Sequence, residues 1–180
     1  MQDTAYLKCI IPKCGKEYVI SSTRIHCDCG NLLDVKYKNT PSSKLKATFY
    51  QRHNPQGSIF NESGVWRFRE LLNFCQIDTE NLEQCSKNLV SLDGAEGRQS
   101  KPYHMSKVAE FIEINSEKLM LQPEGYNPSG SFKDNGMSAA VTHAKMINAK
   151  KIICASTGNT SASAGMFAAN ENIECDVYIP

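Results

Sequence analysis

Residues 131–180 alternate between helical and strand-like patterns, and this alternation constrains the fold more than any other feature of the chain. SFKDNGMSAAVTHAKMINAK carries apolar residues at a helical rhythm, and Ser131 with Asp134 forms a capping-box pattern at its start. A short apolar strand of the buried parallel type (KKIICAS), a second helix (TGNTSASAGMFAANENI) and another strand (ECDVYIP) follow. Short connections between these elements predict a βαβ unit with a parallel sheet, so the fold class is α/β.

The rest of the chain divides into three parts by composition. Residues 1–38 are rich in cysteine and carry two or three short strand patterns. Residues 39–64 are rich in Ser, Asn, Pro and Gly, which predicts a linker that lies over the surface. Residues 65–180 then form the α/β domain, with a short helix in VWRFRELLNF and two strands in EFIEIN and KLMLQPEG.

Composition restricts the class of protein. The 180 residues are 41% hydrophobic and 22% charged, with a formal net charge of +1, which gives no broad electrostatic case for nucleic acid or an anionic membrane. No apolar run reaches the roughly 18 residues of a membrane span, and the start of the chain lacks a secretory signal pattern. Eight cysteines without such a signal indicate reduced thiols or metal ligands. We therefore expect a cytoplasmic protein with no membrane partner.

The glycine-rich stretch GYNPSGSFKDNGM contains one lysine, Lys133. Gly125 and Gly130 have the spacing of a nucleotide P-loop, but Ser131 follows where that loop needs lysine, so a P-loop is disfavoured. Lys133 falls in the first turn of the predicted helix, where the positive end of the helix dipole disfavours a charged amine. A neutral lysine amine can condense with an aldehyde, of which pyridoxal phosphate (PLP) is the outstanding example. The alternative is an ordinary exposed lysine at a helix start.

A second loop, ASTGNTSAS (155–163), lies between the apolar strand and the next helix, at the strand end where open α/β sheets bind ligands. Its hydroxyl groups belong to Ser156, Thr157 and Thr160. Together with the backbone N–H groups around Gly158, they predict a receptor for carboxylate or phosphate, and the amide of Asn159 can donate to a ring oxygen. The alternative is a helix N-cap rich in Ser and Thr. We expect the two loops to follow adjacent strands and to face one ligand.

PEGYNPSGSFKDNGM and CASTGNTSAS, in this order and spacing, resemble the signatures of the threonine synthases, a family within the β-family (fold type II) of PLP enzymes. VWRFRELL and VSLDGAEGR resemble the lead-in of those members that carry a cysteine-rich head. The resemblance is strong over 121–180 and looser before it. It implies the parallel-sheet, three-layer fold of the fold type II enzymes, incomplete in this chain, after a small zinc-ribbon-like β segment.

The resemblance also implies roles for the loop residues. Lys133 would be the Schiff-base lysine and proton shuttle, and Asn159 would bind the PLP ring oxygen next to the imine. The residues that would bind the substrate carboxylate are Ser156, Thr157, Gly158 and Thr160. The implied reaction eliminates phosphate from O-phospho-L-homoserine and adds water to give L-threonine, with PLP as the electron sink.

The sequence departs from the family pattern in three ways. Asn135 stands where the family usually has arginine after the Lys-Asp pair, and the usual EGxTPL lead-in reads EGRQSKPYHM. The glycine-rich loop for the PLP phosphate and the hydroxyl for the pyridine nitrogen have no candidate, and the sheet is left with an unpaired side. We therefore expect the N-terminal part of a longer enzyme, or a truncated product, that alone binds PLP poorly and turns over little or not at all.

The cysteine-rich head carries a candidate metal site at Cys9, Cys14, Cys27 and Cys29. Four residues separate the first pair, but only one separates the second, where a zinc knuckle usually has two, and His26 could replace one ligand. A glycine follows Cys14 and Cys29, as knuckle turns favour. These features predict a structural zinc ion, and the alternative is a ribbon-like fold with reduced thiols.

Two other functions stay open from the sequence. A serine or threonine deaminase of the same fold type shares both loops, although the cysteine head and VWRFRELL favour threonine synthase. A non-catalytic binding module with a zinc-ribbon head is the second, because the head contains Lys8, Lys13, Lys16, Arg24, Lys36 and Lys38. The head lacks the interleaved aromatic and basic residues of nucleic-acid binders, which argues against a nucleic-acid partner. The oligomeric state is also open, with a homodimer of the full-length form as the candidate.

Overall fold

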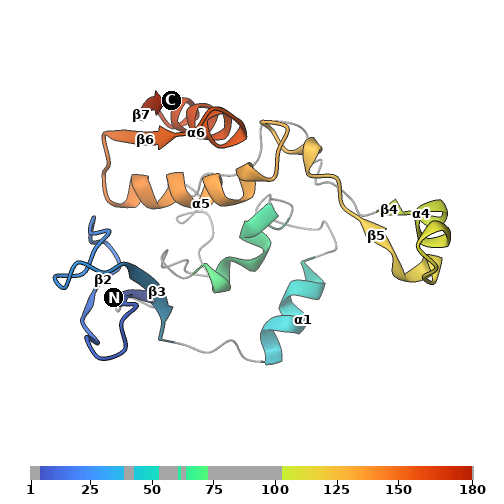
Figure 1. Cartoon of the computed structure of the whole chain (residues 1–180), viewed down its shortest axis with the longest axis horizontal. Coiled ribbons are helices and arrows are strands. Elements are labelled where there is room, and N and C mark those ends of the chain that lie inside the picture. Colours follow the sequence, from blue (N-terminus) through green and yellow to red (C-terminus); the bar gives the residue numbers. More distant parts are fainter. Residues whose placement is uncertain (1–4, 39–42, 53–60, 62–63, 73–102, 180) are drawn as a thin grey trace.

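The computed structural model describes residues 5–38, 43–52, 61, 64–72 and 103–179 (Figure 1). Within these ranges, strands form a three-stranded sheet in the head, a two-stranded antiparallel pair and a two-stranded parallel pair. Helices and strands therefore both contribute, and the expected α/β class is confirmed. Among the described residues, no helix combines the length and the apolar character that crossing a membrane requires.

The head is an antiparallel sheet of β1 (Ala5–Cys9), β2 (Glu17–Val19) and β3 (Leu33–Tyr37) in the order β2-β1-β3. Two or three short strands were expected here, and the structure has three. The strands hold Leu7 opposite Tyr18 on one side and opposite Val35 on the other. The head contacts the second half of the chain, because the carbonyl oxygen of Ile20 lies 3.2 Å from Nε2 of His143.

Two short helices follow the head. Helix α1 (Ser43–Gln51) lies inside the segment expected as a linker, and η1 (Gly64–Leu71) is a 3-10 helix where a short helix was expected. Trp66 of η1 is fully buried, and the rings of Phe49 and Phe68 meet edge to face at 5.1 Å. Aromatic packing of this kind joins the two helices.

The segment after residue 102 begins with β4 (Tyr103–His104), α4 (Ser106–Phe111), η2 (Ser116–Lys118) and β5 (Met120–Leu121), and β4 pairs with β5. Figure 1 shows this unit at one end of the molecule. The prediction of a strand in EFIEIN was wrong. Glu110 and Phe111, the first residues of EFIEIN, are the last two residues of helix α4. Glu113 then adopts a left-handed φ of 58°, which turns the chain. The short helix η3 (Glu124–Tyr126) precedes the lysine-bearing turn.

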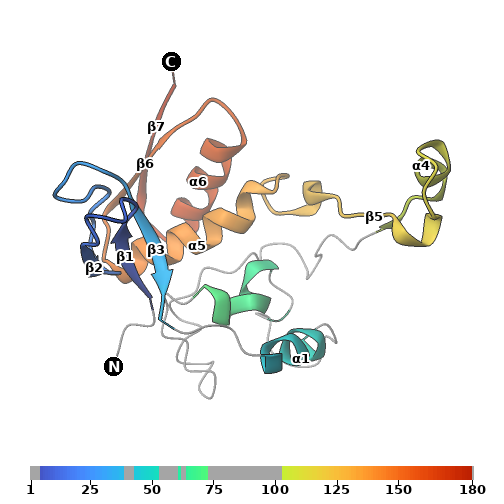
Figure 2. The same ribbon diagram turned by 60° about the horizontal axis from the view of Figure 1, so that its bottom comes forward.

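The expected βαβ unit is confirmed in α5 (Lys133–Met146), β6 (Lys151–Ala155), α6 (Asn159–Asn170) and β7 (Glu174–Tyr178), with β6 and β7 parallel. Figure 2 shows α5 and α6 side by side next to this strand pair. Val141 and Phe167 form the core between them. The partly buried residues packed against this pair are Met137, Ile152, Met166 and Ile173.

The strand β6 differs from the prediction of a strand buried on both faces. Ile152 faces the helices, whereas the next residue, Ile153, is 66% exposed. Tyr178 of β7 is 60% exposed. The helices of the described ranges thus cover one face of the parallel pair.

Candidate functional site

Lys133 lies in the first turn of α5, as expected, where it is the first helical residue, and its side chain is half-buried. Gly130 adopts a φ of +80° in the preceding turn, a conformation that favours glycine. The Lys133 backbone N–H donates to Oγ of Ser131 at 3.2 Å, and its Nζ lies 4.6 Å from the centroid of the Phe132 ring. The turn therefore presents the amine over an aromatic ring at the positive end of a helix.

Asp134 completes the turn in a different way from the predicted capping box. Its carboxylate accepts the backbone N–H of Ser129 at 2.7 Å and also accepts the Ser129 hydroxyl, so it reaches past Ser131. The reason is that helical turns already begin at Ser131, whose carbonyl accepts the Asp134 N–H. The N–H that the Asp134 side chain caps at this helix start is therefore that of Ser129.

The second loop joins β6 to α6. The Ser156 N–H donates to the carbonyl of Tyr178 at 3.2 Å, and the Gly158 N–H donates to Oγ of Ser156 at 3.3 Å. Asn159 is exposed at the first position of α6, and Thr160 is half-buried behind it. N–H groups in the first turn of a helix have no partner within the helix, so this turn can bind an anionic group.

A buried hydrogen bond connects the two loops. Oγ of Ser163, on α6, donates to Oδ1 of Asp134 at 2.6 Å, and both side chains are fully buried. The expectation that the loops follow adjacent strands was wrong, because β5 pairs with β4 and β6 pairs with β7. The loops meet where Asp134, in the first turn of α5, contacts Ser163, one turn into α6.

Glu124 organises the approach to the lysine turn. Its Oε2 accepts the side-chain amides of Asn127 at 2.8 Å and of Asn135 at 3.0 Å. Asn127 also donates to the carbonyl of Ser131 at 3.0 Å. Asn135, which departs from the family pattern, thus donates a hydrogen bond from its neutral side-chain amide to this carboxylate. Sequence reasoning missed Glu124 and Ser163 because their partners lie across the turn and across the helix pair.

The four candidate cysteines of the head form one cluster. The Sγ atoms of Cys9 and Cys29 are 3.6 Å apart, those of Cys14 and Cys27 are also 3.6 Å apart, and all four lie within 4.8 Å of one another. Four sulfurs around zinc at about 2.3 Å in a tetrahedron are separated by similar distances. The cluster consists of cysteines alone, and His26 is not part of it.

The backbone around the cluster supports thiolates. Each sulfur interacts with the backbone N–H two residues further along, including that of Ile11 at 3.4 Å from Sγ of Cys9. Gly15 and Gly30 make these turns possible with φ values of +63° and +81°. Bonds from the side chain and backbone of Asn31 lower the pKa of Cys29 to about 6. For Cys9, the Ile11 N–H lowers the pKa, but burial and the neighbouring thiols outweigh it and raise the pKa to about 12.

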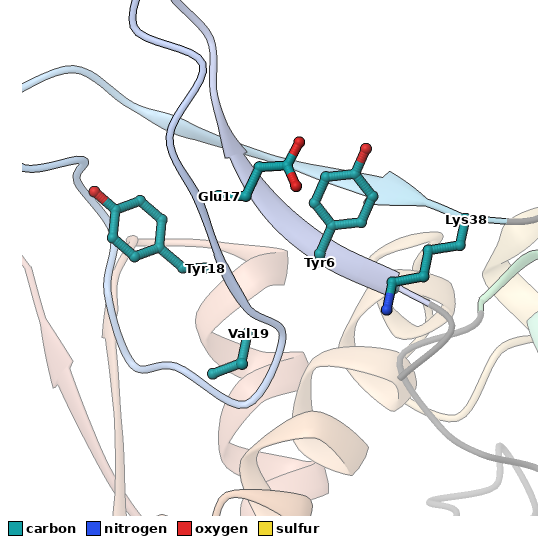
Figure 3. A pocket seen from close by; sticks show the side chains of 6 residues that line it. Tyr6, Glu17, Tyr18, Val19 and Lys38 are labelled. Atoms are coloured by element: carbon teal, nitrogen blue, oxygen red, sulfur yellow. The ribbon is translucent and has the colours of Figure 1, made fainter. Parts of the chain in front are cut away.

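A separate hollow of about 440 Å³ lies on the head (Figure 3). Its lining residues are Ala5, Tyr6, Glu17, Tyr18, Val19 and Lys38. None of them belongs to the two loops or is one of the four cysteines, and they come from β1, β2 and the residue directly after β3. The hollow therefore lies apart from the two loops, but it adjoins the cysteine cluster through Tyr18, whose hydroxyl lies 3.3 Å from Sγ of Cys27.

Comparison with known proteins identifies the relatives of this chain. Residues 102–180 match the family described as pyridoxal-phosphate dependent enzymes. The threonine synthase of Methanocaldococcus jannaschii is 35% identical over 173 residues, covering 96% of this chain and 37% of the relative. That of Methanosarcina acetivorans is 32% identical over 176 residues, covering 97% and 37%. That of Mycobacterium leprae is 57% identical over 62 residues, covering 34% and 17%.

These findings confirm the predicted resemblance to the threonine synthases and the predicted class of PLP-dependent enzyme. PLP is the cofactor that the family match implies. The chain spans about 37% of the length of the first two relatives.

Proposed function

We propose that this chain, whose residues 102–180 belong to the pyridoxal-phosphate dependent enzymes, attaches PLP through Lys133 and serves the threonine synthase reaction. That reaction converts O-phospho-L-homoserine and water to L-threonine and phosphate. One observation carries the proposal: the buried bond between Asp134 and Ser163 joins the lysine turn to the start of α6. This bond supports a site in which Lys133 and the start of α6 face one ligand.

The residues present fit the cofactor. Lys133 is half-buried, and within the described ranges its amine contacts the Phe132 ring and no carboxylate. Such an amine is available for a covalent bond to an aldehyde carbon. When bound, PLP supplies the electron sink that stabilises negative charge on the substrate carbon.

Each loop residue then has a defined task. Nζ of Lys133 would hold the cofactor and would move a proton to and from the substrate carbon. The Asn159 amide would donate a hydrogen bond to the ring oxygen of the cofactor and so orient it. The groups that would bind the substrate carboxylate are the hydroxyls of Ser156, Thr157 and Thr160 and the backbone of the turn from Gly158 to Thr160, in which the Gly158 N–H orients the Ser156 hydroxyl. The free N–H groups of the α6 start favour that negative charge.

The choice of substrate rests on the relatives. The proteins named above are threonine synthases, which favours O-phospho-L-homoserine over the substrates of serine or threonine deaminases. We also propose that the described elements form part of a three-layer fold with a larger parallel sheet, and that the protein acts in the cytoplasm as a homodimer.

Reductive labelling tests the role of Lys133. The chain is incubated with PLP, treated with borohydride and digested, and the labelled peptide is identified by mass spectrometry. We expect the label on Lys133, and its loss in Lys133→Ala but not in Lys150→Ala, which removes an exposed lysine from the same half of the chain. Label spread over surface lysines would refute the proposal.

We further propose that the head binds one structural zinc ion through Cys9, Cys14, Cys27 and Cys29. The close sulfur cluster and the N–H group directed at each sulfur support this site. Zinc measured by elemental analysis should be stoichiometric with the chain, and a chelator should release it and unfold the head. A chain that folds its head without metal, as seen by hydrogen exchange over 5–38, would contradict the proposal.

A further inference from the structure

Asp134 is a buried carboxylate that the proposed reaction does not use. It follows Lys133 directly in the first turn of α5, and its side chain has no exposure to solvent. A carboxylate without water is costly unless donors surround it. Hydrogen-bond donors around Asp134 must therefore offset the cost of burying its carboxylate.

Three donors satisfy the Asp134 carboxylate. Two come from its own turn, the N–H and the hydroxyl of Ser129, and the third is the hydroxyl of Ser163 on α6 at 2.6 Å. The positive end of the α5 dipole adds to this stabilisation. Hydrogen bonds to a charged acceptor are stronger than neutral ones, so these bonds hold their elements firmly.

The third bond determines how α5 and α6 are aligned. Ser163 and Asn159 are four residues apart on α6 and so lie one turn apart on the same face. Asp134 and Lys133 share one turn of α5. A shift or rotation of either helix start would break the bond, and would also change the distance between Lys133 and Asn159.

We propose that Asp134 is a positioning residue whose carboxylate, through Ser163, keeps the turn that bears Lys133 in register with the first turn of α6. This inference rests on the proposed role of Lys133 as the lysine that attaches PLP. Asp134 touches neither cofactor nor substrate in this scheme, because its partners are the turn groups of Ser129 and the buried hydroxyl of Ser163.

The matched pair of variants is Ser163→Ala and Ser138→Ala. Both remove a hydroxyl from a fully buried serine. The Ser138 hydroxyl donates to the Asn135 carbonyl of its own helix, at 3.2 Å, so its loss weakens α5 without touching the link to α6. Asp134→Asn is a third variant, which places an amide opposite the Ser129 N–H. Circular dichroism checks that all three variants keep their secondary structure.

The first measurement is the share of reductive PLP label that falls on Lys133, per folded chain. We expect Ser163→Ala to lower that share about fivefold relative to Ser138→Ala, and Asp134→Asn to lower it more. A purely structural role would lower the amount of folded protein without moving this share. An equal share in Ser163→Ala and Ser138→Ala would overturn the inference.

The second measurement needs no cofactor. Hydrogen exchange on the chain without PLP should rise in the first turns of both α5 and α6 in Ser163→Ala, but only within α5 in Ser138→Ala. Unchanged exchange in the α6 turn would overturn the inference. If the unmodified chain carries no label on Lys133, the proposed function fails, and this exchange result still decides whether Asp134 aligns the two helices.

Discussion

The cysteine head and the α5–β7 unit each present a candidate site at chain turns, but the two sites are held together differently. In the head, each sulfur is supported by a backbone N–H from its own turn, and four side chains converge within 4.8 Å. In the α5–β7 unit, Lys133 and Asn159 begin two separate helices, and one buried hydrogen bond joins those helices at their starts. In the head, local backbone turns thus support each ligand, whereas the other site depends on the packing of two helices.

Replacing one cysteine ligand should have the largest effect, because it should remove zinc and unfold the head while leaving the α5–β7 unit folded. In Cys27→Ser we expect zinc affinity to fall by more than the roughly 10- to 100-fold typical of outer-shell changes, because a thiolate ligand is lost. The head should then lose its protection from hydrogen exchange, since metal binding and folding are coupled in such segments. Zinc content and exchange over 5–38 measure both effects.

The matched control for that variant is Cys154→Ser, a half-buried thiol in β6 away from the cluster. It should retain zinc. Label on Lys133 should persist in Cys27→Ser if the two sites are independent. A variant that loses the label along with the metal would show that the two regions fold as one unit.

A substitution in the core of the α5–β7 unit should destabilise that unit and leave zinc binding by the head unchanged. Phe167 is 3% exposed and packs against Val141 between α5 and α6. We expect Phe167→Ala to lower the free energy of unfolding of this unit by about 3–5 kcal/mol through the cavity it leaves. Chemical denaturation and hydrogen exchange should show the loss in α5 and α6, with zinc content unchanged. Phe111→Ala is the control, because Phe111 is 88% exposed and should cost little.

A smaller change tests how the head holds its ligands. The hydroxyl of Tyr18 lies 3.3 Å from Sγ of Cys27 and accepts the Asp28 N–H at 3.1 Å. Tyr18→Phe should lower zinc affinity by about tenfold, as for other outer-shell partners, measured by competition with a metal-sensitive dye. Tyr6→Phe, in the neighbouring strand β1, should leave affinity unchanged. Equal affinities in both variants would mean that the turn backbone alone sets the site.

The same contrast explains what the sequence could predict of the fold. The α5–β7 elements follow a clear rhythm with short connections, so local pattern was enough to find them. The prediction of a strand in EFIEIN was wrong because helix α4 ends inside this stretch and Glu113 turns the chain with a left-handed φ. The β-branched residues of the stretch gave no sign of either feature. The pairing of β5 with β4 is also a tertiary outcome.

The candidate sites show the same limit. Cysteine spacing predicted the four members of the cluster, but the close pairs join Cys9 to Cys29 and Cys14 to Cys27, across the two segments. Asp134 was recognisable as a capping residue, whereas Ser163 gave no signal beyond its place in a Ser-rich helix start. A partner on another helix depends on packing that a single sequence does not display.

The smallest expected effect is that of pH on the ion pair between Arg52, directly after α1, and Glu70 of η1. Arg52 donates to both oxygens of Glu70, one bond being 2.7 Å, and both side chains are less than a fifth exposed, at 10% and 18%. Burial is the largest single effect on the pKa of Glu70 and raises it. The hydrogen bonds from Arg52 and from the backbone N–H of Glu70, together with the charges of Arg52 and Arg69, outweigh burial and lower the pKa. A lowered carboxyl pKa adds stability above its unfolded value of about 4.3, and that stability is lost as the pH falls through the folded value.

Glu70→Gln should therefore cost about 1–2 kcal/mol at neutral pH, and the difference from the unmodified chain should shrink in acid. Urea denaturation at neutral pH and well below the unfolded value of about 4.3 measures it. Because η1 contacts α5, the loosening should appear in α5 by hydrogen exchange before it appears in the head. Glu110→Gln, on the exposed side of α4, is the control. A cost that is the same at both pH values would show that charge at Glu70 does not stabilise this part of the molecule.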